Sequence, residues 1–114
     1  MFNAKELIKN KNKISDIEKA LLKNFNLDIV DVAIILAVYE NKDQKIPRKY
    51  LSYRFSNMPI TKFNSKIASL VKMNLIKKER PSYDERKITI SIVNKEHCYN
   101  TLIGVEKTIS QFNA

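Results

Sequence analysis

The chain has 114 residues, which suffices for one domain with a core of its own and is too short for two. Its 44% of hydrophobic residues, one Gly and three Pro indicate a globular, mainly helical protein, and no stretch approaches the roughly 18 apolar residues that span a membrane. The formal net charge is +9. The N-terminus has no apolar run like that of a signal peptide, and Cys98 is the one cysteine in the sequence. Both features predict a protein of the reducing cytoplasm.

The charge excess lies entirely in the middle of the sequence. Residues 42–87 hold thirteen basic and four acidic side chains, whereas the other residues hold eight of each. A uniformly basic surface is as often merely solubilising, but a concentrated one favours a polyanionic partner. A membrane surface is less favoured, because it usually requires a basic helix with an exposed, bulky apolar face.

Residues 2–25 form the first predicted helix. Leu7, Ile14 and Leu21 recur at seven-residue spacing with Ile17 between the last two, and lysines and asparagines occupy the other faces. Such a narrow apolar seam is too sparse for burial in a large core. It fits either a surface helix packed on its own domain or, as we slightly favour, a helix that partly meets a second subunit.

A buried central helix is predicted next. Asp28 is its expected N-cap, and Asp31 places a second carboxylate in the first turn, at the positive end of the helix dipole. The run IVDVAIILAVYE is apolar on most faces, which predicts a helix at the centre of the domain. The polar stretch NKDQK ends it, and Ile46 is expected to start a short strand.

Two helices joined by a turn are predicted over residues 47–74. Pro47 suits the first position of the short helix RKYLSYRF, in which Leu51 and Phe55 face inwards. The stretch SNMP forms the turn, and the next helix begins between Pro59 and Thr61. Its core face, at spacings i, i+4, i+7 and i+8, comprises Phe63, Ile67, Leu70 and Val71.

The outer faces of this helix pair carry the residues that we predict to bind nucleic acid. Their hydroxyl, amide and cationic side chains can reach phosphates and base edges without blocking close approach. They are Arg48 and Lys49 on the shorter helix, where Arg54 also stays outside, and Thr61, Lys62, Asn64, Ser65, Lys66 and Ser69 on the longer one. Taken alone, the longer helix would more often be an ordinary solvated helix.

A β-hairpin is predicted over residues 75–93. Asn74 is expected to end the preceding helix in the left-handed conformation, and LIKKERP and KITISIV form the strands. In the second strand Ile88, Ile90 and Ile92 alternate with polar residues, so this strand should cover a core on one side only. The linking stretch SYDER lacks the Asn-Gly or Gly-Gly of a tight turn, which predicts a longer, exposed loop.

Charged residues surround that loop. Arg80, Arg86 and Lys87 are basic, and an arginine at the tip of a projecting loop suits the narrow minor groove of A·T-rich DNA. Asp84 and Glu85 can hold a neighbouring guanidinium in a fixed pose through charge-assisted hydrogen bonds. The 17 Lys, 12 Asn and 15 Ile are typical of proteins from A/T-rich genomes, which weakly favours the same target.

Residues 95–112 form the last predicted helix. Its modest apolar stripe comprises Tyr99, Leu102, Ile103, Ile109 and Phe112, and Gly104 weakens it. Two terminal helices with spare apolar surface predict a homodimer, which would present two reading helices to a palindromic site. The predicted dimer interface consists of Leu7, Ile14, Ile17, Leu21, Ile109 and Phe112.

The stretch LIKKERPSYDERKITISI resembles the wing of the MarR superfamily, and in detail that of the SarA-type staphylococcal accessory regulators. Their pattern is a Lys/Arg run ending in Arg, a short polar insertion, Asp-Glu-Arg and an aliphatic strand; Arg80, residues 81–83 and Asp84, Glu85 and Arg86 match it. The similarity extends more loosely over nearly the whole chain. It implies a winged-helix transcription regulator in which Arg80 and Arg86 contact DNA, Asp84 and Glu85 organise the wing, and residues 59–73 enter the major groove.

The cysteine departs from this resemblance. Several relatives carry their lone cysteine in the first helix, as an oxidation sensor near the dimer interface, whereas Cys98 begins the last helix here. A redox role is therefore not carried over, and a free structural thiol is expected.

Catalysis, metal binding and cofactors find no support in the sequence. His97 and Cys98 are adjacent, so on a helix they point about 100° apart and cannot act as a base and nucleophile pair. One His and one Cys cannot fill a four-ligand zinc site, and one Gly cannot form a glycine-rich phosphate loop. We expect no enzyme, no cofactor, no metal and no small-molecule ligand.

The predicted fold is mainly α with a small β-hairpin wing (α+β), a single winged helix-turn-helix domain over residues 1–114. It comprises a dimerisation helix (1–25), the helix-turn-helix (47–74), the wing (75–93) and a C-terminal helix (95–112). The predicted function is sequence-specific binding of double-stranded DNA as a homodimer. The alternative is a protein-interaction module of the same fold that binds an acidic partner or another regulator. RNA binding is less favoured, because Tyr83 would be the only exposed aromatic residue on the basic surface.

Overall fold

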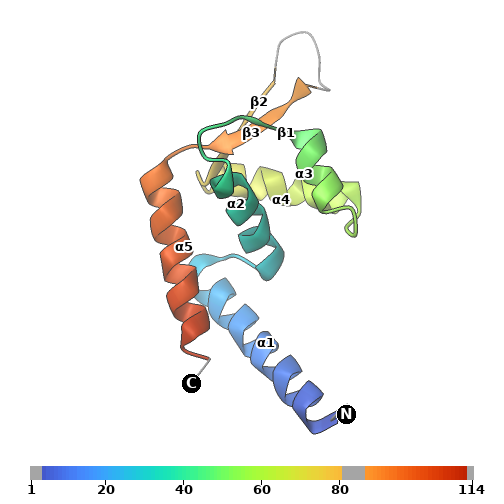
Figure 1. Ribbon diagram of the computed structural model, residues 1–114, viewed down its shortest axis with the longest axis vertical. Helices are drawn as coiled ribbons and strands as arrows, with labels where there is room; N and C mark the ends of the chain where they lie inside the picture. The colour runs from blue at the N-terminus through green and yellow to red at the C-terminus, as the bar shows by residue number, and fades with distance from the viewer. Residues whose placement is uncertain (1–3, 81–86, 113–114) are drawn as a thin grey trace.

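The structure, a computed structural model, describes residues 4–80 and 87–112 (Figure 1). Within them the order is α1 (Ala4–Phe25), α2 (Ile29–Glu40), β1 (Ile46–Pro47), α3 (Arg48–Arg54), α4 (Ile60–Lys72), β2 (Ile76–Glu79), β3 (Thr89–Ile92) and α5 (Lys95–Ser110). The predicted mainly helical fold with a β-hairpin is confirmed. The molecule is elongated, 55 × 29 × 22 Å, with the hairpin at one end and the start of α1 at the other.

Local sequence signals place the start of α2. Asn26 ends the α1 segment in the left-handed conformation, with φ of 57°. The Asp28 N-cap is confirmed and belongs to a capping box: its Oδ1 accepts the Asp31 N–H at 2.7 Å, and Asp31 Oδ2 accepts the Asp28 N–H at 3.0 Å. The side chains of Ile29 and Leu36 are 41% and 45% exposed, so α2 is buried on fewer faces than its apolar sequence predicted.

The helix pair of the predicted helix-turn-helix is present as α3 and α4. Pro47 was expected as the first residue of the short helix, but it belongs to β1, where it pairs with Thr89, and α3 begins one residue later. Its φ of −58° also suits a short edge strand. The Phe55 and Phe63 rings stack with centroids 6.2 Å apart, which ties the end of α3 to α4. Asn74, with φ of 61°, ends the α4 segment in the left-handed conformation, as predicted.

The three strands form one antiparallel sheet in the order β1-β3-β2. Ile90 lies opposite Ile46, and Ile92 lies opposite Ile76; all four are buried. Ser91, opposite Lys77, is only 7% exposed, so the expectation that this strand is covered on one side only is wrong at that position. Ser91 is small and lies directly opposite Lys77, whose methylene groups can shield it from water on this face.

Gly104 of α5 lies against the ring of Phe25 at the end of α1. A Cβ atom at this position would lie 2.9 Å from Cζ of Phe25, closer than real Cβ contacts allow. The glycine that weakens the helix by propensity therefore permits a close approach between the two helices.

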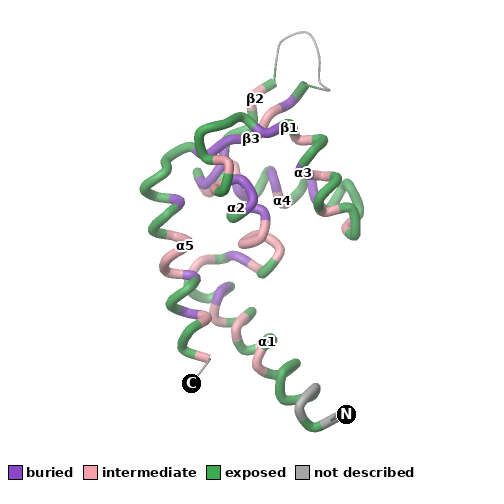
Figure 2. Tube along the Cα trace, viewed as in Figure 1, coloured by how far each residue is buried: buried purple, intermediate pink, exposed green. Residues whose placement is uncertain are grey.

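The N-terminal half of α1 projects from the body of the subunit. Figure 2 shows most of it as exposed or half-buried, and Ile8 and Ile14 are 59% and 51% exposed. Leu21 is 1% exposed in the core of its own subunit, so its predicted place in a dimer interface is wrong. Of the other predicted interface residues, Ile17 and Ile109 are half-buried against the core, Phe112 is half-buried, and the Leu7 side chain lies outside the described part.

Candidate nucleic-acid interface

The outer face of α4 is a polar surface with small side chains at its centre. Predicted residues Thr61, Lys62, Asn64, Ser65 and Ser69 are exposed, whereas Phe63, Ile67 and Leu70 are buried on the opposite face. The middle of the exposed face, at spacings i, i+4, i+7 and i+11, comprises Thr61, Ser65, Ala68 and Lys72. Ala68 and Lys72 were missed by the sequence analysis, although the same helical periodicity places them there. Together these residues leave a face that a duplex could approach closely.

Helix α3 adds cations and two aromatic residues beside α4. Lys49 and Arg54 are exposed, and Arg48 is half-buried, with its backbone N–H donated to the Ile88 carbonyl at 2.9 Å. Tyr50 and Tyr53 are 56% and 79% exposed. The reason given above against RNA binding, that Tyr83 would be the only exposed aromatic residue on the basic surface, is therefore wrong. Short amphipathic helices give no periodicity long enough to show which aromatic residue faces outwards.

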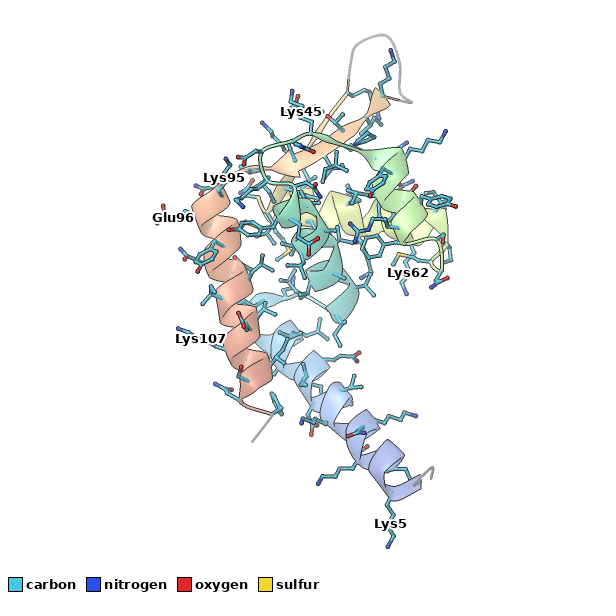
Figure 3. The ribbon with its side chains drawn as sticks, in the orientation of Figure 1. Lys5, Lys45, Lys62, Lys95, Glu96 and Lys107 are labelled. Carbon is cyan, nitrogen blue, oxygen red and sulfur yellow. The ribbon has the colours of Figure 1, made fainter. Side chains whose placement is uncertain are left out.

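The sheet carries further cations. Lys77 and Lys78 on β2 are exposed. The carboxylate of Glu79 lies 2.8 Å from the ammonium nitrogen of Lys45 and 3.2 Å from that of Lys77. The hydrogen bonds from Lys45 and Lys77 hold the pKa of Glu79 below its ordinary value. Figure 3 shows Lys45 beside the sheet and Lys62 near the turn that joins α3 and α4. Because one carboxylate is shared by two ammonium groups, this edge keeps a positive excess.

The described part of the hairpin places Arg80 and Lys87, two of the predicted wing residues, at one end of the molecule. Arg80 and Lys87 are exposed where the two strands lead into the loop. Asp84, Glu85 and Arg86 lie outside the described residues, so their predicted roles stay predictions. The strand register Glu79 with Thr89 fixes where the loop leaves the sheet.

Lys66 does not lie on the outer face, contrary to the prediction. Its ammonium group contacts Oδ2 of Asp28 and lies 3.4 Å from Oδ1 of Asp31, and its side chain is only 12% exposed. Burial alone would lower the pKa of Lys66, but the hydrogen bond to Asp28 and the charge of Asp31 outweigh it and raise that pKa. Lys66 is held by this pair of carboxylates, so it is not one of the proposed DNA-contacting residues.

The pairing makes folding stability depend on pH. Burial alone would raise the pKa of Asp28, but the Lys66 ammonium and the Asp31 backbone N–H outweigh it and lower that pKa. A carboxyl whose pKa is lowered by folding stabilises fully above its unfolded value of about 3.9, and this contribution is lost as pH falls through the folded value. We therefore expect the free energy of unfolding, measured with urea between pH 6 and pH 2, to fall less steeply below pH 4 in Asp28→Asn. Parallel curves for the wild type and the variant would contradict this assignment.

Comparisons with known proteins agree with this geometry. The family model described as "Transcriptional regulator SarA/Rot" matches residues 16–99. The chain belongs to the SarA/Rot family of transcriptional regulators. No curated protein sequence matches it.

Solved structures show the fold of this SarA/Rot regulator in other proteins. It is similar to the transcriptional regulator BldR of Sulfolobus solfataricus, with 20% identity, a TM-score of 0.67 and coverage of 97% of this chain and 81% of that one. AbsC, a MarR family transcriptional regulator of Streptomyces coelicolor, matches with 20% identity, a TM-score of 0.69 and coverage of 95% and 70%. The reduced form of MarR from E. coli matches with 12% identity, a TM-score of 0.67 and coverage of 97% and 79%. At these identities the likeness establishes the MarR-like winged-helix fold.

The remaining chemistry of this SarA/Rot regulator is sparse. Cys98 is fully buried, and burial raises the pKa of its thiol, which disfavours the reactive thiolate. Within residues 4–80 and 87–112, no three His, Cys, Asp or Glu side chains are grouped so as to hold a metal ion. Nor does the described part of the chain contain a helix long and apolar enough to cross a membrane.

A largely apolar pocket of about 390 Å³ lies next to the basic face. Its walls come from α2, from the turn between α3 and α4, and from the start of α4; Arg54 and Lys62 are among the lining residues. The absence of a small-molecule ligand therefore stays a prediction.

Proposed function

We propose that this SarA/Rot regulator binds double-stranded DNA as a homodimer. In this proposal α4 enters the major groove, and the wing lies in the adjacent minor groove, which Arg86 contacts. The observation that carries it is the exposed polar face of α4, together with the exposed cations of α3 and β2, the elements that precede and follow it in the chain. These elements belong to residues 42–87, which hold the whole charge excess of the chain.

The shape of α1 supports the dimer. Its N-terminal half projects with Ile8 and Ile14 exposed, which would be unfavourable for an isolated subunit in water. The C-terminal half packs on its own domain through Leu21 and Phe25, so the surface-helix interpretation holds for that half, and the proposed dimer uses the projecting half. A two-fold axis through the projecting half would present two copies of α4 to a palindromic site.

Arg86→Ala tests the wing. We expect this variant to lose roughly 1–3 kcal/mol of binding free energy for an A·T-rich duplex at fixed salt, because an arginine in a narrow minor groove is lost. The measurement is fluorescence anisotropy with a labelled duplex recovered by selection from random sequences. Lys107→Ala on α5 is the control, because it removes an exposed positive charge outside residues 42–87. An unchanged affinity of Arg86→Ala would contradict the minor-groove assignment.

The exposed Tyr50 and Tyr53, with the exposed Arg54 on the same helix, favour a second function, binding of an acidic protein partner, because Tyr and Arg are enriched in protein interfaces. This alternative predicts weak DNA binding without preference for any duplex. The selection experiment separates the two, since only the first proposal yields an enriched sequence.

A further inference from the structure

Lys66 closes an unusual arrangement at the start of α2. Each carboxylate of the capping box uses one oxygen for the backbone and presents the other to the ammonium group. Asp28 accepts the Asp31 N–H with Oδ1 and Lys66 with Oδ2, while Asp31 accepts the Asp28 N–H with Oδ2 and faces Lys66 with Oδ1. Lys66 and Asp31 are 12% and 15% exposed and Asp28 is 40% exposed, so water competes weakly for Lys66 on the Asp31 side.

The position of the capping box gives this contact its significance. Asp28 lies two residues after Asn26, where the backbone turns out of α1 and into α2. Lys66 lies in the middle of α4, between the buried Phe63 and Ile67. The ion pairs therefore connect α4 directly to the junction of α1 and α2, between segments 35 and 38 positions apart in the sequence.

We infer that Lys66 is a positioning residue that fixes the orientation of α4 relative to α1. The inference rests on the proposed function, because the orientation matters where α1 pairs two subunits and α4 reads DNA. In a two-fold dimer, the angle between the pairing helix and the reading helix determines the distance between the two reading helices. That distance must match half-sites about one helical turn apart.

This role differs measurably from a phosphate contact. A lysine that neutralises a phosphate contributes about one unit to the slope of log affinity against log salt concentration. A positioning residue contributes nothing to that slope, but its loss weakens the discrimination between correctly and incorrectly spaced half-sites. Lys62, one turn earlier on the exposed face of α4, provides the contrast on the same helix.

The experiment uses the duplex selected by the wild-type protein, the same duplex with two base pairs inserted between its halves, and a single half-site. We expect Lys66→Met to reduce the affinity ratio of correct to altered spacing by about fivefold, with an unchanged salt slope and unchanged half-site affinity. Lys66→Arg should keep the ratio, because a guanidinium can hold both carboxylates. Lys62→Met should keep the ratio and lower the slope by about one. A wild-type ratio in Lys66→Met, or a lowered slope, would overturn the inference.

Two further measurements keep the test decisive. Asp31→Asn leaves an oxygen for the capping box and removes one charge facing Lys66, so it should reduce the ratio in the same direction even if Lys66→Met fails to fold. Backbone amide exchange of α4 in the free protein should be faster in Lys66→Met than in the wild type by about fivefold. If the wild type selects no duplex, the proposed function fails, and exchange alone decides; unchanged exchange would then overturn the positioning role.

Discussion

Ser65→Glu is expected to weaken binding of the selected duplex by about 100-fold, because like charges brought together at an interface cost several kcal/mol. Ser65 is exposed in the middle of the outer face of α4, where a carboxylate would meet phosphates and base edges. Titration of labelled duplex by fluorescence anisotropy measures the change. The fold should be unaffected, since Glu is a good helix former.

Asn100→Glu is the matched control for Ser65→Glu. It makes the same change in charge at an exposed position of α5, outside the proposed interface. We expect it to change affinity only through the net charge. Equal effects of the two variants would show that the face of α4 does not contact DNA.

Ile14→Glu is expected to convert the dimer to a monomer and to weaken binding of a two-half-site duplex by about 100-fold or more. Linking two sites in one dimer raises overall affinity by a factor of about 10²–10⁴, and this gain is lost when the subunits separate. Ile14 is 51% exposed on the projecting half of α1, so a glutamate at this position would be buried only if a second subunit covers it. Analytical ultracentrifugation measures the oligomeric state, and a single half-site duplex measures the affinity that remains.

Lys9→Glu is the corresponding control on α1. Lys9 is exposed, and on an α-helix it lies about 100° from Ile8 and about 140° from Ile14. This variant should remain a dimer. If Ile14→Glu also remains a dimer, the seam of α1 does not pair subunits, and the proposed assembly is wrong.

The parts of the fold that the sequence predicted depend on short-range rules. The N-cap at Asp28 and the left-handed Asn74 each involve residues within a few positions of one another. The buried face of α4 follows from the spacing of Phe63, Ile67 and Leu70 alone. Such features are determined by local backbone geometry, so one sequence is enough to find them.

The errors arose where a side chain depends on distant partners. A lysine on an amphipathic helix is expected on the outer face, but the carboxylate partners that bury Lys66 lie 35 and 38 positions away in the sequence. Leu21 continued the seven-residue seam of α1, yet it is buried in the core because only the C-terminal half of α1 packs on the domain. From its propensity alone Gly104 is expected to weaken the last helix, and its proximity to Phe25 becomes visible only in the three-dimensional structure.

The central claim, a dimer that reads duplex DNA through a basic face, is tested most directly by the salt dependence of its affinity for the selected duplex. If each subunit neutralises about four phosphates, log affinity should fall with log salt concentration with a slope near −7. A shuffled duplex of the same composition should bind more weakly at every salt concentration. A slope near zero, or equal affinity for both duplexes, would contradict the claim.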